Sequence, residues 1–215
     1  MKWLRYLSFS LLGLLLAALA LAGHYYYKAY FKPGHSIQSF AATANEEEIL
    51  KIRNKAEQIK EFAQEKNYSQ TIIFLIDMSL PSGKNRFFIY DCKKDSVIAT
   101  ALVAHGSGNY GFSLNAKFSN ACESGYSSLG KYKIGKKYHG SFGIAYKLYG
   151  LDSSNSNAFK RNIVLHAYDC VPRNETYPYP ICNSRGCPMV SPDFMKEIQQ
   201  IIDTDKKPVV LWVFN

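Results

Sequence analysis

The stretch from Thr71 to Ala104 decides the fold, because it contains three successive runs of β-branched and aromatic residues. The turn residues Pro81-Ser82-Gly83 and Lys93-Lys94-Asp95 separate these runs, so consecutive runs are expected to pair antiparallel. We therefore predict a three-stranded antiparallel meander at the start of a β-rich domain. Its strands are TIIFLIDM at Thr71–Met78, RFFIYDC at Arg86–Cys92 and SVIATALVA at Ser96–Ala104.

Two helices and four further strands are expected around the meander. Apolar residues at intervals of three and four predict an amphipathic helix over residues 46–67, with Thr43 and Glu46 as a capping box. Ser191-Pro192-Asp193 supplies an N-cap for a helix that ends near Ile202. The chain is thus expected to be mostly β with flanking helices (α+β), as a sandwich or partly closed barrel. The further strands are expected at Tyr132–Ile134, Phe142–Tyr149, Asn162–Tyr168 and Val209–Phe214.

Residues 1–31 are expected to be a signal peptide or a membrane anchor. No charged residue lies between Arg5 and Lys28, and a helix over this stretch reaches roughly 33 Å, enough to cross a bilayer. Ala20-Leu21-Ala22 resembles a cleavage site, whereas the aromatic residues that follow, from Tyr25 to Phe31, are typical of an uncleaved anchor. In both cases the remainder is exported, with residues 32–45 as a linker and 68–215 as one folded domain.

The charge of the chain does not identify its partner. The 215 residues include 26 Lys plus Arg and 17 Asp plus Glu, a formal net charge of +9. Four of the basic residues precede Glu46, so the rest has 22 basic against 17 acidic residues, or +5. No basic stripe or nucleic-acid-binding motif is present, and we expect no nucleic-acid partner. The apolar content of 47% and aromatic content of 14% exclude a disordered chain.

The cysteines suggest a reactive thiol. The chain has five, and an odd number in an exported protein leaves at least one unpaired. Cys187 is the best candidate: Gly186 allows close backbone approach, Pro188 stiffens the turn, and Arg185 adds positive charge that favours a thiolate. Cys170 and Cys182 flank a Pro-rich loop, and we predict a disulfide between them, although other pairings of the remaining four are open.

A histidine that could act on Cys187 ends a hydrophobic strand at His166. A cysteine–histidine pair is what nucleophilic acyl transfer requires, since the imidazole takes the thiol proton before the sulfur attacks a carbonyl. The Gly-rich segment that begins with His105 and Gly106 is read either as a rim of the same site or as a turn with a solvated histidine. A Cys3His metal site formed by His166, Cys170, Cys182 and Cys187 is a rival interpretation.

Four segments follow one another along the chain: His105-Gly-Ser-Gly, Ser127-Ser-Leu-Gly-x-Tyr, Ile163-Val-Leu-His166 and Ser184-Arg-Gly-Cys187-Pro. In this order they resemble the catalytic domain of the murein L,D-transpeptidases, in the branch with a Ser-x-Gly-Cys-Pro motif. The resemblance runs from His105 through Ser191, and two positions depart from the best-known members: Ala167 replaces a Gly after the histidine, and Met189 replaces an Arg after the cysteine.

The resemblance implies a periplasmic or cell-envelope enzyme that modifies peptidoglycan stem peptides without a metal or organic cofactor. Cys187 would attack the carbonyl of the third stem residue, release the terminal D-amino acid and form a thioester, with His166 as base and acid. An amine on a neighbouring stem would then resolve the thioester. An L,D-carboxypeptidase and a non-catalytic wall-binding domain are the alternatives. The residues expected to bind substrate or the oxyanion are His105, Gly106, Tyr168, Ser184, Arg185 and Gly186.

Overall fold

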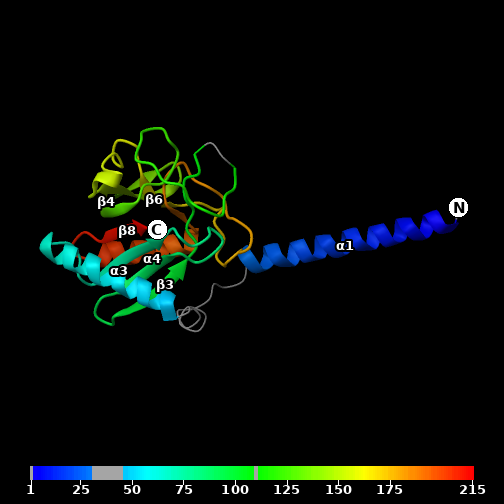
Figure 1. Cartoon of the computed structure of the whole chain (residues 1–215), viewed down its shortest axis with the longest axis horizontal. Coiled ribbons are helices and arrows are strands. Elements are labelled where there is room, and N and C mark those ends of the chain that lie inside the picture. The colour runs from blue at the N-terminus through cyan, green and yellow to red at the C-terminus, as the bar shows by residue number, and fades with distance from the viewer. Residues whose placement is uncertain (1, 31–45, 109–110) are drawn as a thin grey trace.

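The computed structural model describes residues 2–30, 46–108 and 111–215. Helix α1 (Lys2–Tyr30) projects away from a domain that contains every other element (Figure 1). Its segment Ser10–Ala29 is long and apolar enough to cross a membrane. The expected linker over residues 32–45, with the capping residue Thr43, lies outside the described residues.

One mixed sheet of eight strands forms the domain, in the order β3-β2-β1-β8-β4-β5-β6-β7. The pairs β1·β8 and β6·β7 are parallel and the other neighbouring pairs are antiparallel. The strands are β1 (Ile72–Asp77), β2 (Phe87–Asp91), β3 (Ser96–Ala101), β4 (Gly130–Gly140), β5 (Gly143–Gly150), β6 (Val164–Ala167), β7 (Met189–Val190) and β8 (Val210–Phe214), with a 3-10 turn η1 at Ser153–Asn155.

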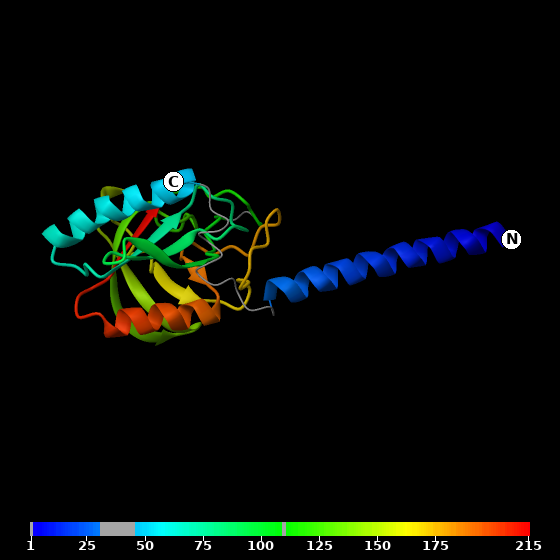
Figure 2. The same ribbon diagram turned by 90° about the horizontal axis from the view of Figure 1, so that it is seen from below.

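Two helices cover opposite faces of the sheet (Figure 2). Helix α3 (Glu46–Glu65) buries the face that carries Ile52 and Ile59 against Ile73 and Leu75 of β1. The alternate residues of β1 point to the other side, where helix α4 (Pro192–Thr204) contributes Ile198. Because successive strand residues face opposite sides, β1 is buried on both of its faces.

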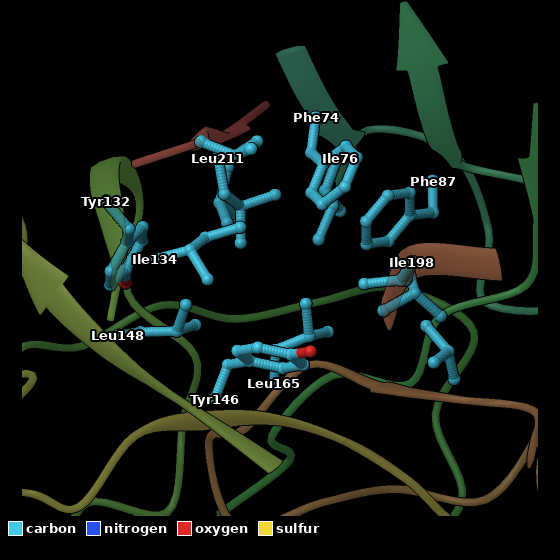
Figure 3. Close-up of a cluster of buried hydrophobic side chains, with 14 of the residues drawn as sticks. Phe74, Ile76, Phe87, Tyr132, Ile134, Tyr146, Leu148, Leu165, Ile198 and Leu211 are labelled. Carbon is cyan, nitrogen blue, oxygen red and sulfur yellow. The ribbon is translucent and has the colours of Figure 1, made fainter. Parts of the chain in front are cut away.

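The larger core lies on the α4 side, where the sheet curves back on itself. Aromatic and aliphatic side chains from both halves of the sheet point toward one another there (Figure 3). Phe74 and Phe87 come from the meander, whereas Tyr146 and Leu148 come from β5. Burial of a side chain of this size stabilises the fold by roughly 1.5–3 kcal/mol. This core supports strands β5 and β6, which lie next to the site described below.

The expected mostly β fold with flanking helices is confirmed, including the antiparallel β1-β2-β3 meander. Strand β4 is longer than expected, because its second half, Lys136 to His139, is polar and exposed and has no apolar alternation to mark it. Phe142 lies in the turn between β4 and β5 and not in the strand. The two-residue β7 was not expected, since it is too short to leave a sequence pattern.

Candidate active site

The parallel pairing of β6 with β7 brings the His166 and Cys187 segments together. His166 pairs with Met189, and the His166 N–H donates a hydrogen bond to the Pro188 carbonyl oxygen at 3.4 Å. The expected cysteine and histidine, which are separated by the whole disulfide loop in sequence, are thus carried on adjacent backbone segments. The sheet holds one of them and the turn that enters β7 holds the other.

Hydrogen bonding sets the orientation of the His166 ring. The imidazole is 3% exposed, and its Nδ1 lies 2.9 Å from the carbonyl oxygen of Ala167. A carbonyl oxygen only accepts, so Nδ1 carries the proton and Nε2 keeps its lone pair in the neutral ring. Burial lowers the pKa of His166, and the hydrogen bond to Ala167, which raises the pKa, offsets this effect only in part. The ring is therefore a neutral base at neutral pH.

The Cys187 thiol is partly buried beside the strand that leads to His166. Burial raises its pKa, whereas the Val164 N–H and the charges of Arg161 and Lys147 lower it. The thiol donates to the Asn162 carbonyl oxygen at 3.8 Å, and within the described residues no hydrogen bond joins it to His166. A protonated thiol must give up its proton to a base before it can attack a carbonyl carbon, and the neutral His166 is able to accept that proton.

The turn that carries Cys187 is fixed by three contacts around Gly186. Gly186 has φ +118°, a conformation that favours glycine, and its N–H donates to the Ser184 hydroxyl at 3.1 Å. The Ser127 hydroxyl donates to the Gly186 carbonyl oxygen at 3.2 Å and accepts from the Gly106 N–H at 2.9 Å. The structure thus brings Gly106, Ser184 and Gly186 together, with Ser127 between two of them.

Arg161 is the cation beside this turn. Its guanidinium donates to the carbonyl oxygens of Ser119 and Tyr126, the first at 2.8 Å, and to the Ser128 hydroxyl. The same group lies against Gly186, since a Cβ there would be 3.1 Å from Arg161 Nη2. Arg185, which was expected to supply positive charge near the thiol, is exposed. Arg161 therefore combines support of the 119–128 loop with positive charge near Cys187.

His105 is buried inside the domain. It is 1% exposed, and its Nδ1 lies 2.8 Å from Nη2 of the buried Arg86. Since a guanidinium only donates, Nδ1 accepts, and the ring is neutral. Burial and the Arg86 charge lower the pKa of His105 to about 4. The interpretation of His105 as a solvated turn residue is wrong, and its backbone instead accepts from the Ser184 N–H at 2.8 Å.

The cysteines divide into one bonded pair and three thiols. Cys170 and Cys182 form a disulfide, while Cys92 is buried, Cys122 exposed and Cys187 partly buried. The disulfide takes two of the four ligands of the rival Cys3His metal site, so that interpretation does not fit these residues. Among the described residues no group of three or more His, Cys, Asp or Glu side chains is placed to hold a metal.

An aromatic pair covers the histidine. The Phe142 ring stacks on His166 with centroids 5.0 Å apart and an interplanar angle of 24°, and Tyr168 meets Phe142 edge to face at 5.3 Å. Phe142 is 55% exposed and Tyr168 is 44% exposed, so both rings also face solvent. Tyr168 was expected at the site from the sequence, whereas Phe142 was not, because a turn between two strands carries no periodic signal.

Comparisons with solved structures find distant resemblances. They include an L,D-transpeptidase from Xylanimonas cellulosilytica (15% identity, 72% of this chain and 68% of that one, TM-score 0.38). They also include the helical cell shape determining protein Pgp2 from Campylobacter jejuni (15%, 66% and 47%, 0.39) and Mycobacterium tuberculosis L,D-transpeptidase 1 (13%, 67% and 62%, 0.34). The chain thus spans 47–68% of the length of these structures.

A comparison of the sequence with curated proteins returned no match. The sequence model of one family does match, over residues 43–213, and its description is L,D-transpeptidase catalytic domain. That range contains helix α3, nearly all of the sheet, and both Cys187 and His166. The chain therefore belongs to the L,D-transpeptidase catalytic domain family.

Proposed function

We propose that the protein is a peptidoglycan L,D-transpeptidase of the cell envelope, with Cys187 as nucleophile and His166 as general base and acid. The observation that carries this proposal is the β6·β7 pairing, which sets the Cys187 turn beside a histidine whose Nδ1 is bonded to the Ala167 carbonyl. This hydrogen bond leaves Nε2 to act on the thiol and on the substrate. Family membership supports the same reaction class.

In the first half-reaction the thiol leaves the Asn162 carbonyl and gives its proton to His166 Nε2. The thiolate then attacks the carbonyl carbon of the third stem-peptide residue, and the carbonyl oxygen becomes an oxyanion. Gly186 N–H is bonded to Ser184, so the Cys187 N–H is the donor we assign to this oxyanion. The carbon–nitrogen bond breaks, His166 returns the proton to the leaving nitrogen, and the terminal D-amino acid departs from the thioester.

In the second half-reaction an amine on a neighbouring stem attacks the thioester. Its proton passes to His166 as the new amide bond forms, and the carbon–sulfur bond breaks with the proton returned to Cys187. Water in place of the amine gives L,D-carboxypeptidase activity from the same site. The charges of Arg161 and Lys147 favour the thiolate in both half-reactions, because they lower the pKa of Cys187.

The test is turnover of a tetrapeptide-stem muropeptide by the full chain in detergent, followed by mass spectrometry. Loss of one D-amino acid with dimer formation is the expected result, and loss without dimers identifies the carboxypeptidase. Cys187→Ala should lose both products. Cys122→Ala is the matched control, because Cys122 is an exposed thiol and should not affect turnover. Equal activity of Cys187→Ala and wild type would overturn the proposal.

A further inference from the structure

The last turn of helix α1 is docked on the folded domain. Residues 10–28 of the helix are exposed, but Ala29 is 3% exposed. Its carbonyl oxygen accepts hydrogen bonds from the N–H groups of Arg173 and Asn174, each at 3.2 Å. The Asn174 side-chain Nδ2 also donates to the Lys28 carbonyl oxygen at 2.7 Å. Carbonyls at a helix end have no partners within the helix, so the domain caps α1.

The segment that caps α1 is the disulfide loop, residues 170–182, and it is itself held firmly. Cys170 and Cys182 close it at both ends. In its middle, the N–H groups of Thr176 and Tyr177 donate to the Gly83 carbonyl oxygen at 2.9 and 3.0 Å. The loop lies against the base of α1 in both views (Figures 1 and 2). The helix therefore meets a fixed surface.

Tyrosines from the helix and from the loop gather at this junction. Tyr25 donates to the Thr176 carbonyl oxygen, and its ring meets that of Tyr179 edge to face at 5.3 Å. Among the side chains of this junction that the structure describes, four tyrosines are more than half exposed. We call them the tyrosine rim: Tyr26 (57%), Tyr27 (55%), Tyr177 (51%) and Tyr179 (60%).

Basic side chains accompany the rim. Lys84 lies over the Tyr177 ring at 5.3 Å from its centroid and pairs with Glu175 at 3.4 Å. Lys28 is in the last turn of α1, and Arg173 of the capping segment pairs with Asp193. Exposed tyrosines beside basic residues, at the end of an apolar helix, have the composition of a protein surface at the lipid headgroups. A general protein-docking patch would not need to coincide with the end of a membrane-length helix.

We infer that the tyrosine rim lies in the headgroup region of the bilayer that α1 crosses, so that the disulfide loop rests on the membrane. The apolar segment Ser10–Ala29 has 20 residues. At 1.5 Å per residue this is about 30 Å, the thickness of the hydrocarbon core. Tyr25 to Tyr27 then lie at one boundary of that core, and the docked loop places Tyr177 and Tyr179 at the same level.

The consequence concerns the active site. The disulfide loop lies between His166 and Cys187 in the sequence, so the segment that touches the membrane joins the two proposed catalytic residues. The site would be held at a fixed height above the lipid and would act on material close to the membrane. This inference needs α1 to remain attached but does not depend on transpeptidation, so the two can fail separately.

The direct test uses the full chain in phospholipid vesicles that contain a lipid with a photoactivatable group near its headgroup. Peptides that contain Tyr177 and Tyr179 should acquire lipid adducts at least about tenfold more often than the peptide that contains Phe159, an aromatic residue of similar exposure in the loop before β6. Equal labelling of the two peptides, or no adducts on the disulfide loop, would overturn the inference.

A second measurement tests the docking itself. Asn174→Ala removes the side-chain hydrogen bond to the Lys28 carbonyl oxygen. Backbone amide hydrogen exchange at residues 173–174 of this variant should be about tenfold faster than in the wild type, the effect of losing roughly 1.4 kcal/mol. Asn157→Ala is the matched control, since Asn157 donates to the Asn120 carbonyl oxygen far from α1. Unchanged exchange in Asn174→Ala, or the same acceleration in both variants, would contradict docking. The labelling of the wild-type chain stands even if a variant does not fold.

Discussion

Gly106 and Gly186 are in direct backbone contact: a Cβ atom on Gly106 would lie 2.6 Å from the Gly186 Cα, and closer still to its nitrogen. The contact joins the segment after His105 to the turn that carries Cys187. Ser127 binds to both glycines, so the three residues form one support for the thiol. The position of Cys187 therefore depends on the absence of a side chain at residue 106.

Gly106→Ala should lower turnover about 100-fold, because a shift of the nucleophile by about 1 Å has an effect of this size. It should also destabilise the fold by about 1–3 kcal/mol through overpacking. The control is Gly111→Ala, where a Cβ meets nothing within 4 Å. Turnover and thermal unfolding of both variants check the prediction, and a Gly106→Ala enzyme with wild-type turnover would contradict it.

Arg161→Gln should move the alkylation of Cys187 by iodoacetamide to higher pH, because the lost positive charge lowers the pKa of this thiol. Lys147→Gln should act in the same direction with a smaller shift, since the Arg161 charge has the larger effect. Peptide mapping of the alkylated protein at several pH values gives both profiles. Exposed Cys122 is the internal control, and a parallel shift at both cysteines would argue against a local charge effect.

Phe142→Ala should raise the pKa of His166 toward its ordinary value, because burial lowers it and the Phe142 ring covers the imidazole. The acid limb of the kcat/KM profile, which reports the base in the free enzyme, should move to higher pH. Phe159→Ala removes another exposed aromatic side chain and should leave the limb in place. A limb that moves to lower pH in Phe142→Ala would show that the ring does not shield His166.

The neutral, buried His105 should make stability depend on pH. Its native pKa of about 4 is below the ordinary 6.5, so the unfolded chain binds the proton first as the pH falls. The contribution of neutral His105 to the free energy of unfolding is complete above pH 6.5. It is lost as the pH falls toward 4, and the total loss is about 3 kcal/mol.

Urea unfolding of the full chain in detergent between pH 7 and 5 measures this slope. His105→Asn should flatten the curve, whereas His166→Asn should leave the His105 part of the slope in place. Identical pH dependence of wild type and His105→Asn would mean that His105 takes up a proton as easily in the folded domain as in the unfolded chain.

Local patterns in the sequence were sufficient for much of the fold. The apolar runs of β1, β2 and β3 and the turns between them predicted the meander, and Ile52 and Ile59 predicted the buried face of α3. The polar second half of β4 and the two-residue β7 were missed. The second half of β4 is held by hairpin pairing with β5, and β7 by pairing with β6 across the disulfide loop, and neither pairing leaves an apolar alternation in the sequence.

The residues of the candidate site were also predicted only in part from the sequence. Cys187, His166 and Gly106 could be proposed from residue type and motif order, and the fold brings their segments together. Arg161, Lys147 and Phe142 were missed, because each acts through a contact across the sheet or a turn. Ser127 was named only as the start of one matched segment and was given no role, although its hydroxyl joins Gly106 to Gly186. Arg185 was expected to supply charge because it is close in sequence, but it is exposed, and the charges that lower the pKa of Cys187 are those of Arg161 and Lys147.

An acyl group on Cys187 is the intermediate on which the proposed function depends, and trapping it decides the matter. The full chain is mixed with a tetrapeptide-stem muropeptide, quenched in acid within the first turnover, and analysed by intact mass and peptide mapping. We expect an adduct equal to the donor minus its terminal D-amino acid, located on Cys187, absent in Cys187→Ala and retained in Cys122→Ala. An adduct on another residue, or dimer formation by Cys187→Ala at the wild-type rate, would contradict it.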